Sequence, residues 1–333
     1  MTDPARRLTP VVRLAPAKLN LTLAIVGRRP DGYHALHSVM VPLGLADRLS
    51  LAVQSDGEDS LHSTGFDPGP AHDNLVLKAV AAARGAVGPP RGSAAPPLAI
   101  RLDKRIPVAA GLAGGSSDAA AAVTGALEAW GAELDPQQRL ALAAGLGSDV
   151  PFFFGSGAAL VEGRGERVTP LHGVRTATGE ATQPPGVLLV TPAVPVHTAT
   201  VFAAWSDGAM AEPGVARRTS EHFASEFGSG LSVRAFLERA AVLASANDLL
   251  PAAAAVVPGL VPLRRALARL LGRPIGLSGS GATLWALYPS LDGAETAAST
   301  VRAAVADRTV AFPGDDPPFV AATTIEAGRR SDQ

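Results

Sequence analysis

The sequence predicts an α+β protein with two domains, and three observations lead to this prediction. Stretches with apolar residues at every second position indicate strands, whereas stretches with helix-start and glycine-stop signals indicate helices. A length of 333 residues is enough for two domains. With 47% hydrophobic and 18% charged residues, the chain can also bury a sizeable core.

The composition argues against several function classes. A net charge of −1 gives no basic footprint for nucleic acid or an acidic membrane, and zero cysteines exclude disulfides, thiol catalysis and zinc–thiolate sites. The first residues lack an apolar signal core, and no run approaches the ~18 apolar residues of a membrane span. We therefore expect a soluble cytoplasmic protein without nucleic-acid or membrane partners.

The first half of the chain is expected to mix strands and helices. Alternating apolar and polar residues predict strands, and cap residues followed by helix formers predict helices. Residues 54–72 indicate a loop or short hairpin, and 158–168 a strand–turn–strand. The expected strands are 11–26, 37–43, 47–53 and 98–106, and the expected helices follow Asn74, Ser116 and Asp135.

The second half is expected to form a smaller α+β domain. The Thr-, Gly- and Pro-rich residues 172–186 suggest a linker, which gives domains at 1–171 and 187–330. Residues 207–230 are rich in Gly, Ser and Ala, so we expect them to be mobile. The expected helices are 197–205, 232–244, 260–271 and one capped by Asp292, and the expected strands are 187–191, 283–288 and 319–325.

A glycine loop precedes an alanine-rich segment at residues 107–130. Gly111, Gly114 and Gly115 lead into Ser116–Ser117–Asp118, whose side chains are typical of helix starts. A glycine loop at a helix N-terminus binds phosphate through free backbone N–H groups. A tight loop–helix joint fits these residues equally well. Neither a Walker-type loop nor a dinucleotide-binding glycine motif is present.

Lysine occurs only at Lys18, Lys78 and Lys104, and all other basic residues are arginine. An ammonium group is compact and a guanidinium is planar, so each lysine raises the question of a specific role. Lys18 and Asn20 project from the polar face of the first strand. A solvated strand edge is the alternative to a functional pair.

Three further residues follow turn signals. Tyr33 and His34 come after Arg-Pro-Asp-Gly, where an aromatic ring beside a histidine can stack on a ring-shaped ligand. A plain surface pair fits them as well. Asp149 lies on a loop constrained by Pro151, next to three phenylalanines. A partly desolvated carboxylate there can act as a base, and a turn aspartate is the alternative.

Four segments in fixed order closely resemble the GHMP small-molecule kinases: PAKLNLTLAIVGRRPDGYH, PVAAGLAGGSSDAA, GLGSDVPFFFGSGAALVEGRGE and GLSGSGAT. The resemblance implies a two-domain GHMP kinase fold. Its N-terminal domain would be ribosomal-protein-S5-domain-2-like, and its C-terminal domain a ferredoxin-like α/β domain. One departure is Ala113, where many members have glycine, which matters if that position needs a positive φ.

The resemblance also implies site residues. Lys18 and Asp149 match the catalytic lysine and aspartate. The ATP loop would consist of Pro107, Val108, Ala109, Ala110, Gly111, Leu112, Ala113, Gly114, Gly115, Ser116 and Ser117. The substrate-binding positions would be Asn20, Tyr33, His34, Thr198, Gly279 and Gly281, with Tyr33 and His34 on the side of a cytosine ring.

Within the family, the segments are most similar to members that phosphorylate the C2 hydroxyl of 4-diphosphocytidyl-2-C-methyl-D-erythritol in the non-mevalonate isoprenoid pathway. This similarity implies ATP as co-substrate, Mg²⁺, and a monomer or homodimer; the metal ligands stay open. Two alternatives remain at this point. One is another kinase of this family, for homoserine, a mevalonate derivative or a sugar; the other is a non-catalytic nucleotide-binding sensor.

Overall fold

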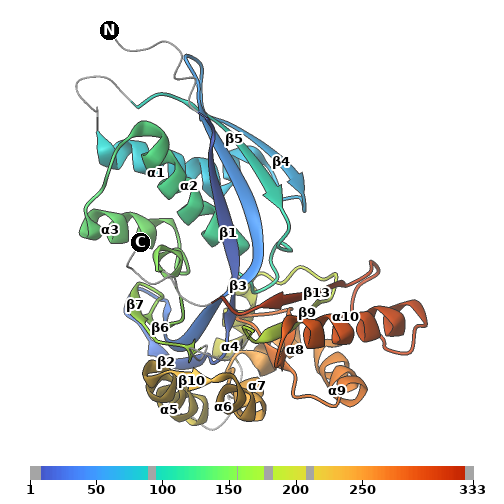
Figure 1. Ribbon diagram of the computed structural model, residues 1–333. Helices are drawn as coiled ribbons and strands as arrows, with labels where there is room; N and C mark the ends of the chain where they lie inside the picture. The colour runs from blue at the N-terminus through green and yellow to red at the C-terminus, as the bar shows by residue number, and fades with distance from the viewer. Residues whose placement is uncertain (1–8, 89–94, 156, 176–182, 208–213, 327–333) are drawn as a thin grey trace. The chain divides into compact units, whose positions relative to one another are not determined.

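A computed structural model of the chain describes residues 9–88, 95–155, 157–175, 183–207 and 214–326. Helices and strands are mixed along these residues, which confirms the α+β class (Figure 1). The chain forms two compact units that are interleaved in sequence. Unit 1 comprises Met1–Ala17, Ala46–Val108 and Ala113–Phe154; unit 2 comprises Lys18–Leu45, Ala109–Leu112 and Gly155–Gln333.

Unit 1 contains a sheet with helices on one face (Figure 1). Strand β5 (Leu98–Lys104) pairs in parallel with β4 (Ser60–Gly65) and antiparallel with the second half of β3 (His34–Val53). Strand β1 (Val11–Asn20) also pairs with β3. The helical elements are η1 (Ala71–Asp73), α1 (Leu75–Val87), α2 (Gly114–Trp130), α3 (Pro136–Leu146) and η3 (Pro151–Phe154).

The starts of α1 and α3 follow from their cap residues. Asn74 accepts a hydrogen bond from the backbone N–H of Val76, and Asp135 forms a capping box with Gln138. The two helices and α2 bury an apolar core with the strands, which includes Leu49, Leu51, Val80, Ile100 and Val123. The part of α2 in this core begins at Ala119, after the first turn of the helix.

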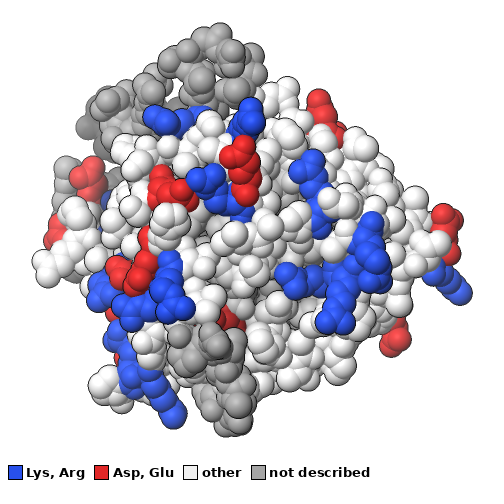
Figure 2. Space-filling view, turned by 90° about the horizontal axis from the view of Figure 1, so that it is seen from below, with Lys and Arg blue, Asp and Glu red and all other residues white. Residues whose placement is uncertain are grey.

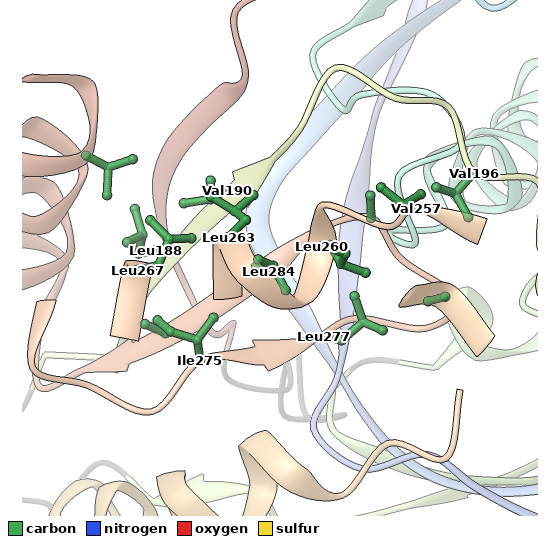
Figure 3. Close-up of a cluster of buried hydrophobic side chains, with 14 of the residues drawn as sticks. Leu188, Val190, Val196, Val257, Leu260, Leu263, Leu267, Ile275, Leu277 and Leu284 are labelled. Carbon is green, nitrogen blue, oxygen red and sulfur yellow. The ribbon is translucent and has the colours of Figure 1, made fainter. Parts of the chain in front are cut away.

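Unit 2 contains a four-stranded antiparallel sheet in the order β11 (Gly276–Leu277), β12 (Leu284–Tyr288), β9 (Gly186–Thr191), β13 (Phe319–Thr324). Every residue of β9 and β12 is buried. Figure 3 shows apolar side chains of both strands in one cluster with side chains of α9. The helices of this part are α4 (Thr198–Asp207), α8 (Leu250–Val256), α9 (Leu260–Leu271) and α10 (Leu291–Ala306).

A second part of unit 2 surrounds the first half of β3. That half pairs antiparallel with β2 (Ala24–Arg28) and with β6 (Ala159–Gly163), and β6 pairs with β7 (Arg167–Pro170). Two short strands, β8 (Val174–Arg175) and β10 (Leu231–Ser232), pair in parallel. The helices of this part are α5 (Val215–Ser229), α6 (Val233–Glu238) and α7 (Ala240–Ser245).

The predicted mobility of residues 207–230 is wrong for the described part, since residues 215–229 form α5. The reason is aromatic packing: Phe223 and Phe227 stack with ring centroids 4.8 Å apart, and Phe227 stacks on Phe236 at 5.7 Å. Composition alone does not reveal this, because the burying partner lies on α6. Residues 208–213 lie outside the described part.

Four smaller predictions are also wrong. The strand over 11–26 is interrupted, because Leu21 and Leu23 donate backbone hydrogen bonds to Val39 and Ala246. Residues 60–65 form β4, which pairs with β5 rather than in a local hairpin. The helix over 232–244 divides at Arg239, which pairs with Glu226 of α5. Helix α10 is capped by Ser290 and not by Asp292.

The domain boundaries at 171 and 187 stay a prediction. Of the expected linker, Val174–Arg175 forms β8, and residues 176–182 lie outside the described part. Within the described residues, no single helix has the length and apolar content to cross a membrane, although the pair α8 and α9, bent by 115°, passes the same test together. On the face in Figure 2, acidic and basic side chains form several mixed groups and one basic group, separated by wide uncharged areas.

Candidate active site

The Lys18 side chain is buried in unit 2 and held by two acceptors. Its Nζ donates to Asn20 Oδ1 at 2.6 Å and to the Gly111 carbonyl oxygen at 2.8 Å. Lys18 is 3% exposed and Asn20 2% exposed, so the solvated-edge interpretation is excluded. The strand alternation correctly predicted that the two side chains lie on one face. A buried ammonium is costly unless it is paired and hydrogen-bonded.

The second glycine element brings its backbone to the same ammonium. Gly279 has φ +57°, and a Cβ there would lie 3.2 Å from Lys18 Nζ and 3.3 Å from Asn20 Oδ1. Asn247 Nδ2 donates to the carbonyl oxygens of Leu277 and Gly279, at 3.0 and 2.9 Å, and so fixes this approach. Gly281 faces an apolar side chain instead of the ammonium, since a Cβ there would lie 3.1 Å from the Leu277 side chain.

The first glycine loop packs against the second within unit 2. Gly111 has φ +79°, and a Cβ there would lie 2.3 Å from the Ser278 carbonyl oxygen, so only glycine fits. Ser278 Oγ donates to Gly111 O at 3.0 Å. The segment is also tied by its backbone: the carbonyls of Ala109, Ala110 and Leu112 accept from Val196, Thr283 and Lys18.

Helix α2 begins in unit 1, directly after the loop. Its N-cap is Ala113, which has φ 53° and ψ 32° and makes no side-chain cap bond. The capping expected of Ser116, Ser117 and Asp118 is therefore wrong, because the helix has already begun at Gly114. The first N–H groups of α2 have no intrahelical partner and are available to an anion. Ser117 Oγ is buried and has no hydrogen-bond partner among the described residues.

A buried charge cluster in unit 1 holds this helix start, and sequence analysis missed it. Lys104 Nζ donates to Asp118 Oδ2 at 2.8 Å and also pairs closely with Asp47 Oδ2. Asp47 Oδ1 accepts from the backbone N–H groups of Arg105 and Ile106. Burial raises the pKa of Asp118 to about 7, with Lys104 opposing and Asp47 adding to the rise. The cluster joins β5, the loop entry and α2.

Asp149 lies in unit 1 on a loop that approaches the first turn of α2. The Val150 N–H donates to the Gly147 carbonyl oxygen at 3.3 Å, and Val150 is buried. A Cβ on Gly147 would lie 3.9 Å from Ser116 Oγ, which is an ordinary contact distance. Asp149 itself is half-buried. Lys18 belongs to unit 2, and the expected approach of Lys18 and Asp149 stays a prediction.

His34 lies in an aromatic group of unit 2. Its ring stacks on Phe202 with centroids 5.2 Å apart and meets the Trp205 ring edge-on at 5.1 Å. Burial, and to a smaller extent Arg28, lowers the pKa of His34, which favours the neutral ring. Both partners come from α4, whose first residue is Thr198. Thr198 Oγ1 lies 3.1 Å from Ser280 Oγ.

Tyr33 is the exposed neighbour of this group. It is 52% exposed, and the Arg164 guanidinium lies 4.9 Å from the centre of its ring. Phe202, Trp205 and Arg164 were not predicted as site residues. A signal existed for Phe202 and Trp205, because they follow Thr198 at helical spacing on a segment predicted to be helical.

Known proteins resemble the chain in sequence and in structure. The model of the GHMP kinases N terminal domain matches residues 74–157. A 4-diphosphocytidyl-2-C-methyl-D-erythritol kinase from Pelotomaculum thermopropionicum is 36% identical over 88% of this chain and 94% of its own length. A crystal structure of 4-(cytidine 5'-diphospho)-2C-methyl-D-erythritol kinase matches with TM-score 0.64 and 33% identity, covering 94% of this chain and 99% of that chain.

The fold alone is shared more widely. A crystal structure of L. major mevalonate kinase matches with TM-score 0.67 over 99% of this chain and 100% of that chain, at only 14% identity. Sequence identity therefore separates the relatives where the fold does not. On this evidence, the chain belongs to the GHMP kinases and, within them, to the 4-diphosphocytidyl-2-C-methyl-D-erythritol kinase family.

Proposed function

We propose that this protein transfers the γ-phosphoryl group of ATP to the C2 hydroxyl of 4-diphosphocytidyl-2-C-methyl-D-erythritol, giving the 2-phosphate and ADP. Relatives at 36 to 40% identity over nearly the whole chain are named for this substrate. The observation that carries the proposal is the buried Lys18 ammonium, held by Asn20 and Gly111 under the second glycine element. The product would enter the non-mevalonate route to isoprenoid precursors.

The chemistry follows from the needs of phosphoryl transfer, which are positioning and charge neutralisation. Residues 107–117 would bind the phosphates, with the N–H groups at the start of α2 as donors. Asp149 would accept the proton of the C2 hydroxyl, and Lys18 would stabilise the developing negative charge on that oxygen.

Magnesium would accompany the nucleotide. Among the described residues, no group of three or more His, Asp or Glu side chains is placed to hold a metal ion. We therefore expect the ion to be held mainly by the triphosphate, because Mg²⁺ commonly binds substrate phosphate oxygens and keeps several waters. When bound, it would supply charge neutralisation at the β- and γ-phosphates. The N–H groups of α2 would orient the same phosphates.

The cytosine ring would bind beside His34 and Tyr33. A planar base stacks on aromatic faces, and the His34–Phe202 stack already sets one plane in unit 2. A neutral imidazole offers one donor and one acceptor to the edge of a base. Thr198, at the start of α4, would lie near the methylerythritol end. Gly279 and Gly281 would close the cleft that holds the nucleotide and the substrate.

A substrate panel tests this function. ADP release is followed with ATP and, in turn, 4-diphosphocytidyl-2-C-methyl-D-erythritol, the same compound without cytosine, mevalonate and homoserine. We expect turnover with the first compound and a kcat/KM at least about 100-fold lower without the base, since a site built to hydrogen-bond a base is left unpaired. Equal rates on mevalonate or homoserine, or no ADP with any alcohol, would contradict the proposal.

A further inference from the structure

Helix α5 carries a serine whose position the reaction proposed above does not explain. Ser220 is 0% exposed, on a helix with no sequence motif of its own. A serine inside a helix can bond back to its own helix, as Ser229 does to the Ser225 carbonyl, or point to solvent. Ser220 Oγ instead bonds off the helix. It lies 2.7 Å from Thr22 Oγ1, 2.8 Å from His37 Nδ1 and 3.3 Å from the His37 carbonyl oxygen.

The hydrogen bonds around Ser220 can be directed in two ways that leave no hydroxyl hydrogen unused, because Ser220 Oγ can donate to His37 Nδ1 or to the His37 carbonyl oxygen. Thr22 Oγ1 accepts from the Val39 N–H at 3.0 Å, so the Thr22 hydroxyl can donate to Ser220. Ser220 can then donate to His37 Nδ1. Burial lowers the pKa of His37, with Arg217 adding to this effect and Glu162 and Glu221 opposing it. A neutral His37 protonated on Nε2 would accept from Ser220 at Nδ1, and the other tautomer would donate to Ser220 from Nδ1.

The series of hydrogen bonds continues from Thr22 to the ammonium of Lys18. Ser38 Oγ donates to the Thr22 carbonyl oxygen at 2.5 Å and accepts from Asn20 Nδ2 at 2.8 Å. Asn20 Oδ1 in turn accepts from Lys18 Nζ at 2.6 Å. Thr22, Ser38, Asn20 and Lys18 are each 3% exposed or less. So little solvent reaches these side chains that the loss of one partner leaves a polar group unpaired, which is costly.

We propose that Ser220 is a positioning residue for the Lys18 ammonium. It fixes Thr22 at the break between β1 and β2; Thr22 fixes Ser38, Ser38 orients the Asn20 amide, and Asn20 holds Lys18. The effect of this series of hydrogen bonds on catalysis rests on the proposed function. The geometric link between Ser220 and Lys18 does not. Helix α5 would thus supply Ser220 to the buried hydrogen-bond network that ends at Lys18.

Two readouts test the link, and the first needs no activity. The chain has three lysines, so ¹³C-lysine labelling gives three resolvable sets of side-chain signals. Ser220→Ala should shift the Lys18 Cε–Hε signals and leave those of exposed Lys78 in place. Ser225→Ala, at an exposed serine of the same helix, should shift neither. An unchanged Lys18 signal in a folded Ser220→Ala protein would overturn the proposal whether or not the wild type is this kinase.

The second readout is kinetic. Ser220→Ala should lower kcat by about 10- to 100-fold, because small misplacements of a reacting group carry such costs, with KM for both substrates nearly unchanged. Ser38→Ala should have a similar effect, and the double variant should be little worse than either single one. Additive losses, or wild-type kcat in Ser220→Ala, would contradict the link. A wild type without activity would instead refute the proposed function.

A matched pair covers the case in which Ser220→Ala does not fold. Thr22→Ser keeps the hydroxyl that bonds Ser220, and Thr22→Val keeps the shape without it. We expect near-wild-type kcat and Lys18 signals for Thr22→Ser, and a lower kcat with shifted Lys18 signals for Thr22→Val. Equal behaviour of the two variants in both readouts would overturn the proposal.

Discussion

The Lys18 ammonium nitrogen lies 2.6 Å from Oδ1 of Asn20, an amide whose orientation is set by its second hydrogen bond, from Nδ2 to Ser38 Oγ. The amide accepts from the ammonium without cancelling its charge. A positive charge in so buried a place acts strongly on a phosphoryl group, because little solvent screens it.

Asn20→Asp tests the value of that neutral partner. The substitution keeps the size of the side chain, removes the donor to Ser38 and places a negative charge against Lys18. We expect kcat to fall by about 100-fold or more, since the electrostatic stabilisation of the transition state is reduced. Steady-state kinetics measure the effect, and thermal unfolding confirms the fold. A kcat within twofold of wild type would show that the charge state of this pair is irrelevant.

Asp149→Asn tests the proposed base. Removing a general base typically costs about 10² to 10⁴ in rate, while ATP binding, measured by calorimetry, should persist. Asp135→Asn is the matched control, because Asp135 caps α3 and asparagine caps equally well. Near-wild-type turnover in Asp149→Asn would remove Asp149 from the role.

The Asp118 carboxyl predicts a pH dependence of stability. Its pKa is raised to about 7 by burial, so between about pH 4 and 7 the folded state holds a proton that the unfolded state releases. Stability therefore falls as pH rises through this window, by at most ~1.4 kcal/mol per pH unit, and levels off above it. Urea unfolding from pH 5 to 8 measures it.

Asp118→Asn isolates that contribution, because asparagine does not titrate. The free energy of unfolding of the wild type minus that of the variant should decrease from pH 5 to 7. A difference that is constant or increases over this range would mean that Asp118 is ionised throughout.

Several features were predictable because they depend on residues close in sequence. Strand alternation placed Lys18 and Asn20 on one face, and the helix predicted at 260–271 is α9, after which Gly272 has a left-handed conformation. The Asp135 cap with Pro136 is likewise local. In each case the physical cause lies within a few residues, so the local sequence pattern predicts the feature.

The remaining features depend on partners far apart in the chain. Lys104 lies between Asp47 and Asp118, and no spacing rule links those three positions. Asp118 was interpreted as a helix-start residue, although its carboxylate bonds Lys104 instead. The three lysines differ in burial: Lys18 and Lys104 are buried, and Lys78 is exposed.

Ala113 carries a left-handed backbone that suits glycine better. An alanine at φ 53° costs roughly 1–2 kcal/mol relative to the right-handed region. Glycine would remove this cost, but its greater conformational freedom in the unfolded chain offsets part of the stabilisation. We expect Ala113→Gly to stabilise the protein by about 0.5–1 kcal/mol. Ala141→Gly, on an exposed part of α3, should instead destabilise it by about 1 kcal/mol. Chemical unfolding separates them, and a loss of stability in both would contradict the strain at Ala113.

The identity of the phosphorylated product is the most direct test of the proposed reaction. Wild-type protein is incubated with ATP, Mg²⁺ and 4-diphosphocytidyl-2-C-methyl-D-erythritol, and the mixture is followed by ³¹P NMR. We predict a new phosphomonoester signal, coupled to no neighbouring C–H because C2 is tertiary, that grows in step with ADP. ADP that appears with inorganic phosphate alone, or a phosphate on another hydroxyl, would contradict the assignment of Lys18 and Asp149 to C2 phosphorylation.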